Sequence, residues 1–245
     1  MPEISVLHKV NLHIAEGKTI GLVGESGSGK STLGKAIMKL CDVSAGSILF
    51  EEKEITGMRE EEFRPLRKEI QMIFQDPQSS LNPRQKVGKI LSDPMINFGI
   101  CNSREQAYEK AVNILERVGL SSNYIDRYPH QLSGGQRQRV GIARAISVEP
   151  RLVVADEIVS GLDVSVQAKI LKLLKGLQEE MGLSLLFISH DLSVIRVVCD
   201  YVVVMYEGKV VEEGDCNDIF RKPSHNYTKE LLEAIPLPKI EKDWL

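Results

Sequence analysis

A glycine-rich stretch near the start of the chain has the residues needed to hold a phosphate. Gly24-Glu25-Ser26-Gly27-Ser28-Gly29-Lys30-Ser31, followed by Thr32, fits the pattern G-x-x-x-x-G-K-[ST]. Such glycines leave backbone N–H groups free to surround a phosphate, and a following helix adds its positive end. In this pattern Lys30 reaches the β- and γ-phosphates and the Ser31 hydroxyl ligates Mg²⁺. A chance Gly/Ser turn is the alternative, but the number of matched positions predicts a nucleoside triphosphate site.

Two adjacent acidic residues, Asp156 and Glu157, follow the apolar run Leu152–Ala155. The carboxyl ends of strands form the edge at which open α/β sheets bind ligands. We expect Asp156 to hold Mg²⁺, directly or through water, and Glu157 to polarise the attacking water. Two acids that merely cap a turn would look the same in isolation. The phosphate loop in the same chain favours the catalytic interpretation.

A second candidate anion site lies far along the chain, at Leu132-Ser133-Gly134-Gly135-Gln136. Ser133 can cap the helix that follows, and the two glycines expose backbone N–H groups at the start of that helix. An ordinary Ser-Gly-Gly helix cap is the alternative. Kinases and most other P-loop enzymes have no use for a second such site.

Buried strands must position these residues. Thr19–Val23 is predicted as a strand that leads into the glycine-rich turn. Three short runs rich in β-formers lack alternation, which is typical of strands buried on both faces: Ile70–Phe74, Leu152–Ala155 and Ser184–Ile188. Apolar residues at helical spacing predict an amphipathic crossover helix between the last two runs. Helices are also predicted from about Lys30 to Leu40, over 104–118 and over 136–146.

The flanking segments have a different pattern. Ile4–Ile14 and Tyr201–Glu213 alternate, which predicts half-buried antiparallel strands, the second with a hairpin turn at Glu207-Gly208-Lys209. Residues from about 77 to 148 are mostly helical in pattern, and Ser224–Ile235 predicts a short C-terminal helix. The predicted fold is α/β: a P-loop NTPase core with a mostly parallel sheet, N-terminal antiparallel β strands and an inserted helical subdomain.

Composition limits the possible partners. The chain has 245 residues and a formal net charge of −3, so it lacks the basic excess of a nucleic-acid-binding protein, and we expect no nucleic-acid partner. Its four scattered cysteines predict reduced thiols in a cytosolic protein. We see neither a signal peptide nor an apolar stretch near the ~20 residues that span a bilayer. Work at a membrane would therefore require another subunit to hold the chain there.

Taken together, these motifs closely resemble the ABC ATPase family, whose signature is LSGGQ. The resemblance covers essentially the whole chain and implies ATP and Mg²⁺ as ligands. It implies head-to-tail pairing, in which Ser133, Gly134, Gly135 and Gln136 of one domain cover the γ-phosphate held by the other. Alternating closure of this dimer, driven by ATP, would then do mechanical work.

The resemblance also assigns three elements whose signals are weak alone. Gln75 matches the Q-loop glutamine, which contacts Mg²⁺ or water and faces the transmembrane partner. Ser160-Gly161-Leu162-Asp163 matches the D-loop at the dimer interface, and His190 matches the switch histidine that senses the γ-phosphate. Without the family pattern, Gln75 would be a solvated polar residue, Asp163 a helix cap and His190 a structural histidine.

Two further segments narrow the family. Phe74–Pro83 resembles the Q-loop region of oligopeptide, dipeptide and nickel importer ATPases, and Ser224–Leu232 resembles the extension that they carry. Cys216 stands alone where one class of their paired ATPases has a cysteine cluster, so the resemblance implies the cluster-free partner. The implied domains are an ABC ATPase domain over 1–222, with the helical subdomain at about 77–148, and an extension over 223–245.

The same resemblance implies the partners and the location. A second ATPase subunit completes the dimer, a different chain in most such importers, with a homodimer as the alternative for the isolated chain. Two transmembrane permease subunits would hold the pair at the cytoplasmic face of the cell membrane as a peripheral component. An extracytoplasmic solute-binding protein would act indirectly, and the cargo is chosen by these other subunits.

Two departures from the family pattern carry expectations. Ile158-Val159 replaces the frequent Pro-Thr, and we expect little loss of activity because neither position carries chemistry. No Phe, Tyr or Trp precedes Gly24, where the family has an aromatic ring for adenine. His8 is a poor substitute if it lies inside a strand. Either the stacking residue precedes the residues given or stacking is weak, and the hypothesis is weak affinity with poor ATP-over-GTP discrimination.

Three other functions are alternatives to transport. A non-transport ABC ATPase, acting as a mechanical regulator, typically carries a long coiled coil or two ATPase domains. A P-loop kinase needs an acceptor site and a lid and leaves the LSGGQ stretch unexplained. A nucleotide-binding module without activity would lack Glu157 or His190, and both are present.

Overall fold

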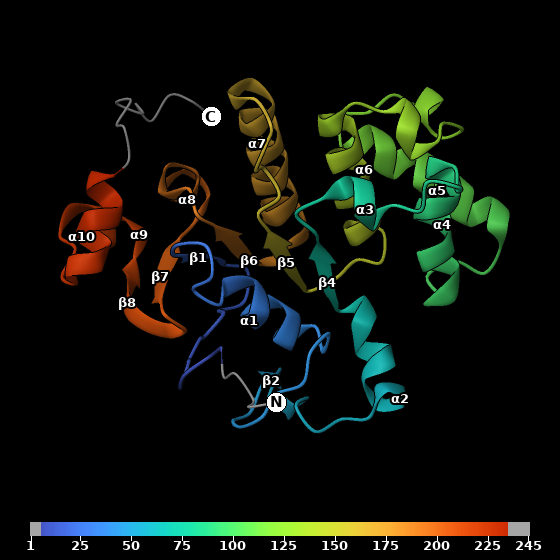
Figure 1. Cartoon of the computed structure of the whole chain (residues 1–245). Coiled ribbons are helices and arrows are strands. Elements are labelled where there is room, and N and C mark those ends of the chain that lie inside the picture. Colours follow the sequence, from blue (N-terminus) through green and yellow to red (C-terminus); the bar gives the residue numbers. More distant parts are fainter. Residues whose placement is uncertain (1–5, 235–245) are drawn as a thin grey trace.

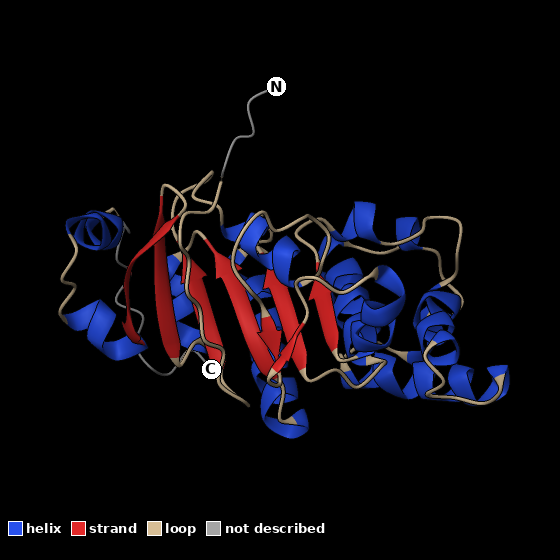
Figure 2. Ribbon diagram, turned by 90° about the horizontal axis from the view of Figure 1, so that it is seen from below, coloured by secondary structure: helices blue, strands red, loops and turns tan. Residues whose placement is uncertain are grey.

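A six-stranded sheet forms the centre of the computed structural model, which describes residues 6–234. The strand order is β4-β5-β6-β1-β7-β8, and all neighbours are parallel except β7 and β8. Figure 2 shows the strands side by side with helices on both faces. The bounds are β1 Thr19–Val23, β4 Ile70–Ile73, β5 Leu152–Asp156, β6 Ser184–Ser189, β7 Tyr201–Tyr206 and β8 Lys209–Asp215. The predicted buried strands are thus confirmed.

Two apolar clusters hold the layers together, one on each face of the sheet. Helix α1 (Lys30–Ile37) packs on the face that carries Leu22, Val154 and Ile188. Helices α6 (Gly134–Ile146), α7 (Val164–Met181) and α8 (Leu192–Val198) cover the other face. Each fully buried aliphatic side chain contributes roughly 1.5–3 kcal/mol. The sheet edge that carries the loops is therefore anchored on a rigid core.

A group of helices is inserted between β4 and β5, although these strands are neighbours in the sheet. It contains α3 (Pro77–Ser80), α4 (Val87–Asn97), α5 (Arg104–Arg117) and α6, with short 3-10 turns at Ser122–Tyr124 and Pro129–Gln131. Figure 1 shows the group at the β4 end of the molecule. Arg144 on α6 donates a hydrogen bond to the carbonyl of Ser80 at 2.6 Å. This bond ties the end of the segment after Gln75 to the helix that begins with the signature.

The predicted strand Ile4–Ile14 is wrong over residues 6–14, which form an irregular segment; Ile4 and Ser5 lie outside the described residues. The alternation itself is real, because Val10, Leu12 and Ile14 pack against the core while the residues between them are exposed. A strand also needs a hydrogen-bonded neighbour. Within residues 6–234, none of the strand pairings includes this segment.

Antiparallel pairing occurs at two other places. A small separate sheet joins β2 (Leu49–Phe50) to β3 (Lys53–Glu54), ahead of α2 (Glu60–Phe63) and the 3-10 turn Arg64–Lys68. The predicted hairpin joins β7 to β8. Its turn residues Glu207 and Gly208 have φ values of 46° and 75°, the left-handed conformation that two-residue hairpins favour.

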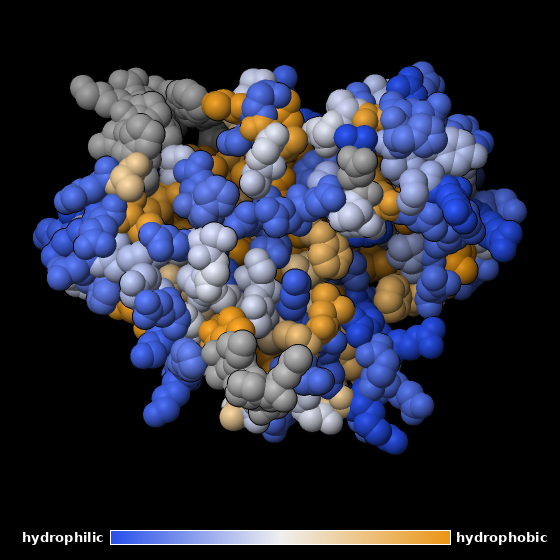
Figure 3. All heavy atoms as spheres, viewed as in Figure 1, coloured by the Kyte–Doolittle hydropathy of each residue, from blue (hydrophilic) through white to orange (hydrophobic). Residues whose placement is uncertain are grey.

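The C-terminal part packs beside β8, at the opposite end of the sheet from the helical insertion (Figure 1). It consists of α9 (Cys216–Arg221) and α10 (Asn226–Glu233), which confirms the predicted short helix. The face in Figure 3 is largely hydrophilic, with apolar residues scattered over it. Among the described helices, none has both the length and the apolar character needed to cross a bilayer.

Candidate functional site

The glycine loop leaves the buried strand β1 and ends at the start of α1. Gly27 and Gly29 have φ values of 84° and 99°, which L side chains rarely adopt, and Gly29 is the N-cap of α1. A Cβ on Gly24 would lie 2.1 Å from the carbonyl oxygen of Met205 on β7. Glycine is thus required both for the turn and for the close approach of β7.

Lys30 turns back into this loop. Its side chain is almost fully buried, and its Nζ donates to the carbonyls of Gly24 and Glu25, each at 2.7 Å. A longer contact of 3.3 Å goes to the Ser28 hydroxyl. Burial lowers the pKa of Lys30, and the nearby carboxylates, that of Glu157 first, act against this shift. The loop therefore surrounds a positive charge with backbone oxygens and leaves one N–H only weakly engaged.

Two of the three predicted oxygen ligands of Mg²⁺ meet where α1 begins and β5 ends. The Ser31 hydroxyl donates to Asp156 Oδ1 at 3.0 Å, and Asp156 is 6% exposed. Burial raises the pKa of Asp156, the hydrogen bond from Ser31 lowers it, and the charge of Glu157 raises it further. A cation placed here would replace the stabilising contact that Ser31 now supplies.

Gln75, Glu157 and His190 come together although they lie on three different strand ends. The Gln75 side-chain amide donates to Glu157 Oε2 at 2.9 Å, and His190 Nδ1 lies 3.4 Å from Glu157 Oε1. These residues follow β4, β5 and β6, which are adjacent parallel strands. Parallel strands bring their carboxyl ends to one edge, which explains the cluster.

Glu157 adopts a backbone conformation that the sequence did not reveal. Its φ is 46°, a left-handed value that costs of order 1–3 kcal/mol for a residue with a side chain. Its N–H donates to the carbonyl of Ile188 on β6, which helps to hold it there. Ile158 and Val159, which follow, are buried in the apolar core. The turn therefore directs the Glu157 side chain to the site and the next two side chains inward.

The signature segment makes its contacts elsewhere. Ser133 and Gln136 form a capping box at the start of α6, and the Gln136 side chain donates to the Tyr124 hydroxyl at 2.9 Å. Gly135 is closely approached by Val166 on α7. Within residues 6–234, Ser133–Gln136 makes no hydrogen bond to the phosphate loop. Within one chain the two candidate anion sites are therefore separate structural units.

Asp163 ends the segment Ser160-Gly161-Leu162-Asp163 as the N-cap of α7. Its carboxylate accepts from the Val166 N–H at 3.0 Å and from the Ser165 hydroxyl at 2.7 Å. Hydrogen bonds from Ser165 and Val166 lower the pKa of this exposed carboxyl. Leu162 lies near Gly134. The helix-cap role weighed for Asp163 is thus present, and the segment lies beside the start of the signature helix.

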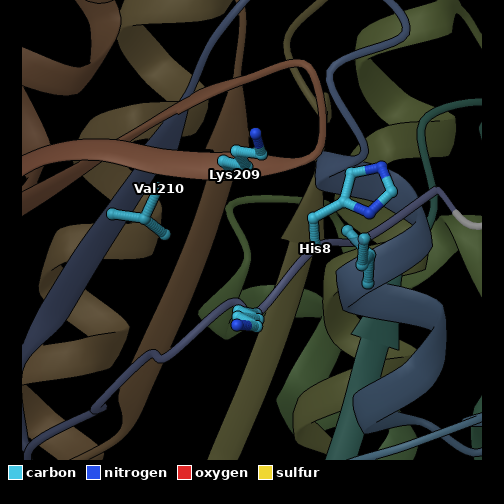
Figure 4. A pocket seen from close by; sticks show the side chains of 5 residues that line it. His8, Lys209 and Val210 are labelled. Carbon is cyan, nitrogen blue, oxygen red and sulfur yellow. The ribbon is translucent and has the colours of Figure 1, made fainter.

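His8 is a poor candidate for stacking on adenine if it lies inside a strand, but the structure has no strand at that position. The His8 N–H donates to the carbonyl of Gly208 at 2.7 Å, and Leu7 lies close to Gly29. The exposed His8 ring borders a hollow between the N-terminal segment and the β7–β8 hairpin, together with Lys209 and Val210 (Figure 4). The N-terminal segment thus lies against the phosphate loop.

Sequence reasoning missed Tyr227 as a neighbour of the phosphate loop. Its hydroxyl accepts a hydrogen bond from the Glu25 N–H at 2.8 Å. Residue spacing gives no signal for this contact, because Tyr227 lies on α10 in the C-terminal extension. Only the packing of α10 beside β8 brings the two together.

A glycine loop that follows a buried strand, an acidic pair at the end of a parallel strand two places away in the sheet, and a buried loop lysine define a P-loop nucleoside triphosphatase. A family model described as "ABC transporter" matches residues 7–160, and one described as "Oligopeptide/dipeptide transporter, C-terminal region" matches residues 211–245. The chain belongs to the ABC transporter family. It is of the ATP-binding type, which hydrolyses ATP.

Individual relatives are consistent with this assignment. The oligopeptide transport ATP-binding protein OppF of Escherichia coli is 48% identical over 229 residues, which cover 94% of this chain and 69% of the relative. OppF of Streptococcus pyogenes is 49% identical over 229 residues, covering 93% of this chain and 75% of the relative.

Solved structures give the same result. One is the dimeric post-hydrolysis state of the ATP-binding cassette MJ0796, bound to ADP and Pi, with a TM-score of 0.79 and 31% sequence identity. The match covers 86% of this chain and 90% of the MJ0796 chain. A second dimeric structure of MJ0796, a bacterial ABC transporter cassette, has a TM-score of 0.80 and 32% identity, and covers 88% and 94%. The predicted α/β fold with its P-loop core is confirmed.

Proposed function

We propose that this chain is the ATPase subunit that powers an importer of peptides or of a related small solute such as nickel. The observation that carries the proposal is the cluster of Gln75, Asp156, Glu157 and His190 beside the phosphate loop. The C-terminal match to the oligopeptide/dipeptide transporter region and the relatedness to OppF support peptide cargo. A non-transport mechanical regulator finds no support among the relatives named above.

Each residue of the cluster has a role in this proposal. Lys30 and the backbone of Gly24–Thr32 bind the phosphates of ATP. Glu157 orients the attacking water and accepts its proton, and Gln75 and His190 hold the Glu157 carboxylate in place. His190 also stabilises charge that develops on the γ-phosphate. The positions of these groups on rigid strand ends support this division of labour.

Ser31 and Asp156 suit Mg²⁺ as protein ligands. Mg²⁺ prefers oxygen ligands and binds through one or two protein groups together with phosphates and water. The hydroxyl and the buried carboxylate, 3.0 Å apart, provide such a pair, and Gln75 is the third candidate. When bound, the ion neutralises phosphate charge.

A second ATPase subunit completes the site in this proposal. Ser133–Gln136 would cover the γ-phosphate held by the partner, because the segment lies apart from the phosphate loop of its own chain. The dimeric state of the MJ0796 structures supports such pairing. We infer a heterodimer, with a homodimer as the alternative, and Ser160–Asp163 at the interface. Two permeases, contacted near Gln75–Pro83, would hold the pair at the cytoplasmic face of the membrane.

We divide the chain accordingly into an ABC ATPase domain over 1–222, including the helical subdomain at about 77–148, and an extension over 223–245.

Purification of the tagged chain from its own cells in mild detergent tests the function. We expect two membrane-spanning subunits and a second P-loop ATPase to co-purify, and ATP hydrolysis to rise when a peptide-loaded binding protein is added. Recovery with soluble partners alone would contradict the transport function.

Nucleobase selectivity is a further prediction. Residues 1–23 contain no Phe, Tyr or Trp, so a protein made of residues 1–245 is expected to bind ATP weakly and GTP almost as well. Stacking on an aromatic ring contributes about 1–3 kcal/mol per base. Titrations with ATP and GTP under one set of conditions measure the ratio of their dissociation constants. Tight binding with a strong preference for adenine would refute the expectation.

A further inference from the structure

One side chain of the C-terminal extension contacts the phosphate loop. The Tyr227 hydroxyl accepts a hydrogen bond from the Glu25 N–H at 2.8 Å, across a separation of 202 residues. Tyr227 is 7% exposed, and its ring centre lies 4.3 Å from that of Tyr206, with the planes tilted by 42°. The hydroxyl is therefore held in a packed environment at the first turn of the loop.

The hydrogen-bonded N–H belongs to a peptide unit that also holds Lys30. The carbonyl of Gly24 and the N–H of Glu25 lie in one plane, because the peptide bond between them is planar. The carbonyl accepts from Lys30 Nζ at 2.7 Å, while the N–H donates to Tyr227. Gly24 has no side chain to restrict its backbone. An external contact that fixes this plane therefore also fixes the direction of the carbonyl that anchors Lys30.

The Lys30 ammonium has three N–H donors. Two are directed to the carbonyls of Gly24 and Glu25, and the contact to Ser28 is longer, at 3.3 Å. The N–H directed to Ser28 can therefore be transferred to a phosphate oxygen at the smallest cost in free energy. Phosphate binding thus depends on the two carbonyls keeping the ammonium at the centre of the loop.

We propose that Tyr227 is a positioning residue for ATP binding. Acting through the Gly24–Glu25 peptide, its hydroxyl holds the Lys30 ammonium where it meets the phosphates. The inference rests on the proposed role of the glycine loop as the ATP site. It makes nucleotide affinity depend on the docking of the C-terminal extension.

The extension is anchored independently of this contact. Glu212 on β8 accepts from the N–H and the hydroxyl of Ser224, at 2.7 and 2.8 Å, and from the N–H of His225 at 3.0 Å. Partial burial acts to raise the pKa of Glu212, but the hydrogen bonds outweigh it and lower the pKa to about 2. Leu231 and Leu232 on α10 pack against the apolar core. Glu212 thus sets the position of the segment that presents Tyr227.

Tyr227→Phe in the full chain tests the inference, because it removes the hydroxyl and keeps the ring. We expect the dissociation constant and the KM for ATP to rise about 3- to 20-fold, from the loss of one hydrogen bond and of loop pre-organisation. The kcat should stay within about twofold, because the residues around Glu157 are untouched. ATP titration, steady-state kinetics and thermal unfolding give the three readouts.

Two other variants distinguish a role of the Tyr227 hydroxyl from a role of ring packing and test the dependence on docking of the extension. Tyr206→Phe is the matched control, since it removes a hydroxyl from the same ring pair without touching Glu25, and it should bind ATP like the wild type. Glu212→Ala keeps Tyr227 but loosens the extension, and it should weaken ATP binding in the same direction.

The outcomes distinguish this inference from the proposed function. If Tyr227→Phe binds ATP like the wild type while Lys30→Ala loses binding, the Tyr227 inference is wrong and the ATP site stands. An equal loss in Tyr206→Phe would assign the effect to ring packing and also overturn the inference. If Lys30→Ala binds ATP normally, the assignment of the loop itself fails.

Discussion

Glu157→Gln is expected to bind ATP about as well as the wild type and to lose ~10²- to 10⁴-fold in turnover. The substitution preserves the size of the side chain and an oxygen that can accept from the Gln75 amide, 2.9 Å away in the wild type. It removes the negative charge that accepts a proton from water. Phosphate binding by Lys30 and the loop does not require that charge.

The backbone of the variant should be unchanged. The Glu157 N–H donates to Ile188, and the flanking Asp156 and Ile158 are buried, so the left-handed turn is held by its surroundings. The expected consequence is a stable ATP-bound state. In the homodimer that is the alternative for the isolated chain, this state is closed, so ATP should convert the isolated variant from monomer to dimer in size-exclusion chromatography.

Glu149→Gln provides the matched control for this prediction. Glu149 also has a positive φ, of 55°, but it precedes β5 at the opposite end of the strand and is exposed. Its contact is a 3.7 Å ion pair with Lys110, and surface pairs of this kind contribute about 0–1 kcal/mol. The control should hydrolyse ATP normally. Normal hydrolysis by Glu157→Gln would remove Glu157 from the catalytic role.

Local sequence was sufficient for the parts of the site that lie on buried strands. Uniform apolar runs indicated the parallel strands, and residues that follow such strands must share one edge. The proximity of Gln75, Glu157 and His190 follows from this rule together with the strand order β4-β5-β6. The order itself was not predicted, because residue patterns do not specify which strands are neighbours.

The errors arose where structure depends on distant partners. The alternation over 6–14 correctly indicated which side chains face the core, but strand formation depends on a neighbouring strand. The contact between Tyr227 and Glu25 joins the two ends of the described chain and leaves no trace in spacing. The left-handed turn at Glu157 is likewise imposed by the site, since glutamate has no intrinsic preference for it.

Lys30→Ala should be impaired in ATP binding, the step that precedes hydrolysis. We expect its ATP affinity to fall by roughly 10²-fold or more, because charge-assisted hydrogen bonds contribute about 1.5–3 kcal/mol each. The variant loses the ammonium that meets the phosphates and leaves the carbonyls of Gly24 and Glu25 without their donor. Two oxygens that face a phosphate would then repel it. Isothermal titration with ATP measures the loss directly.

The fold should tolerate this change, which separates affinity from stability. Burial lowers the pKa of Lys30, so keeping its charge inside the loop costs free energy that alanine does not incur. The relief of this cost offsets the loss of the donor to the two carbonyls, so we expect a thermal unfolding midpoint close to that of the wild type. Lys172→Ala, an exposed lysine on α7, should leave both affinity and stability unchanged. Unaltered ATP binding by Lys30→Ala would contradict the assignment of the ATP site. If Lys30→Ala loses binding while Glu157→Gln binds ATP like the wild type, the two residues act in separate steps of one reaction.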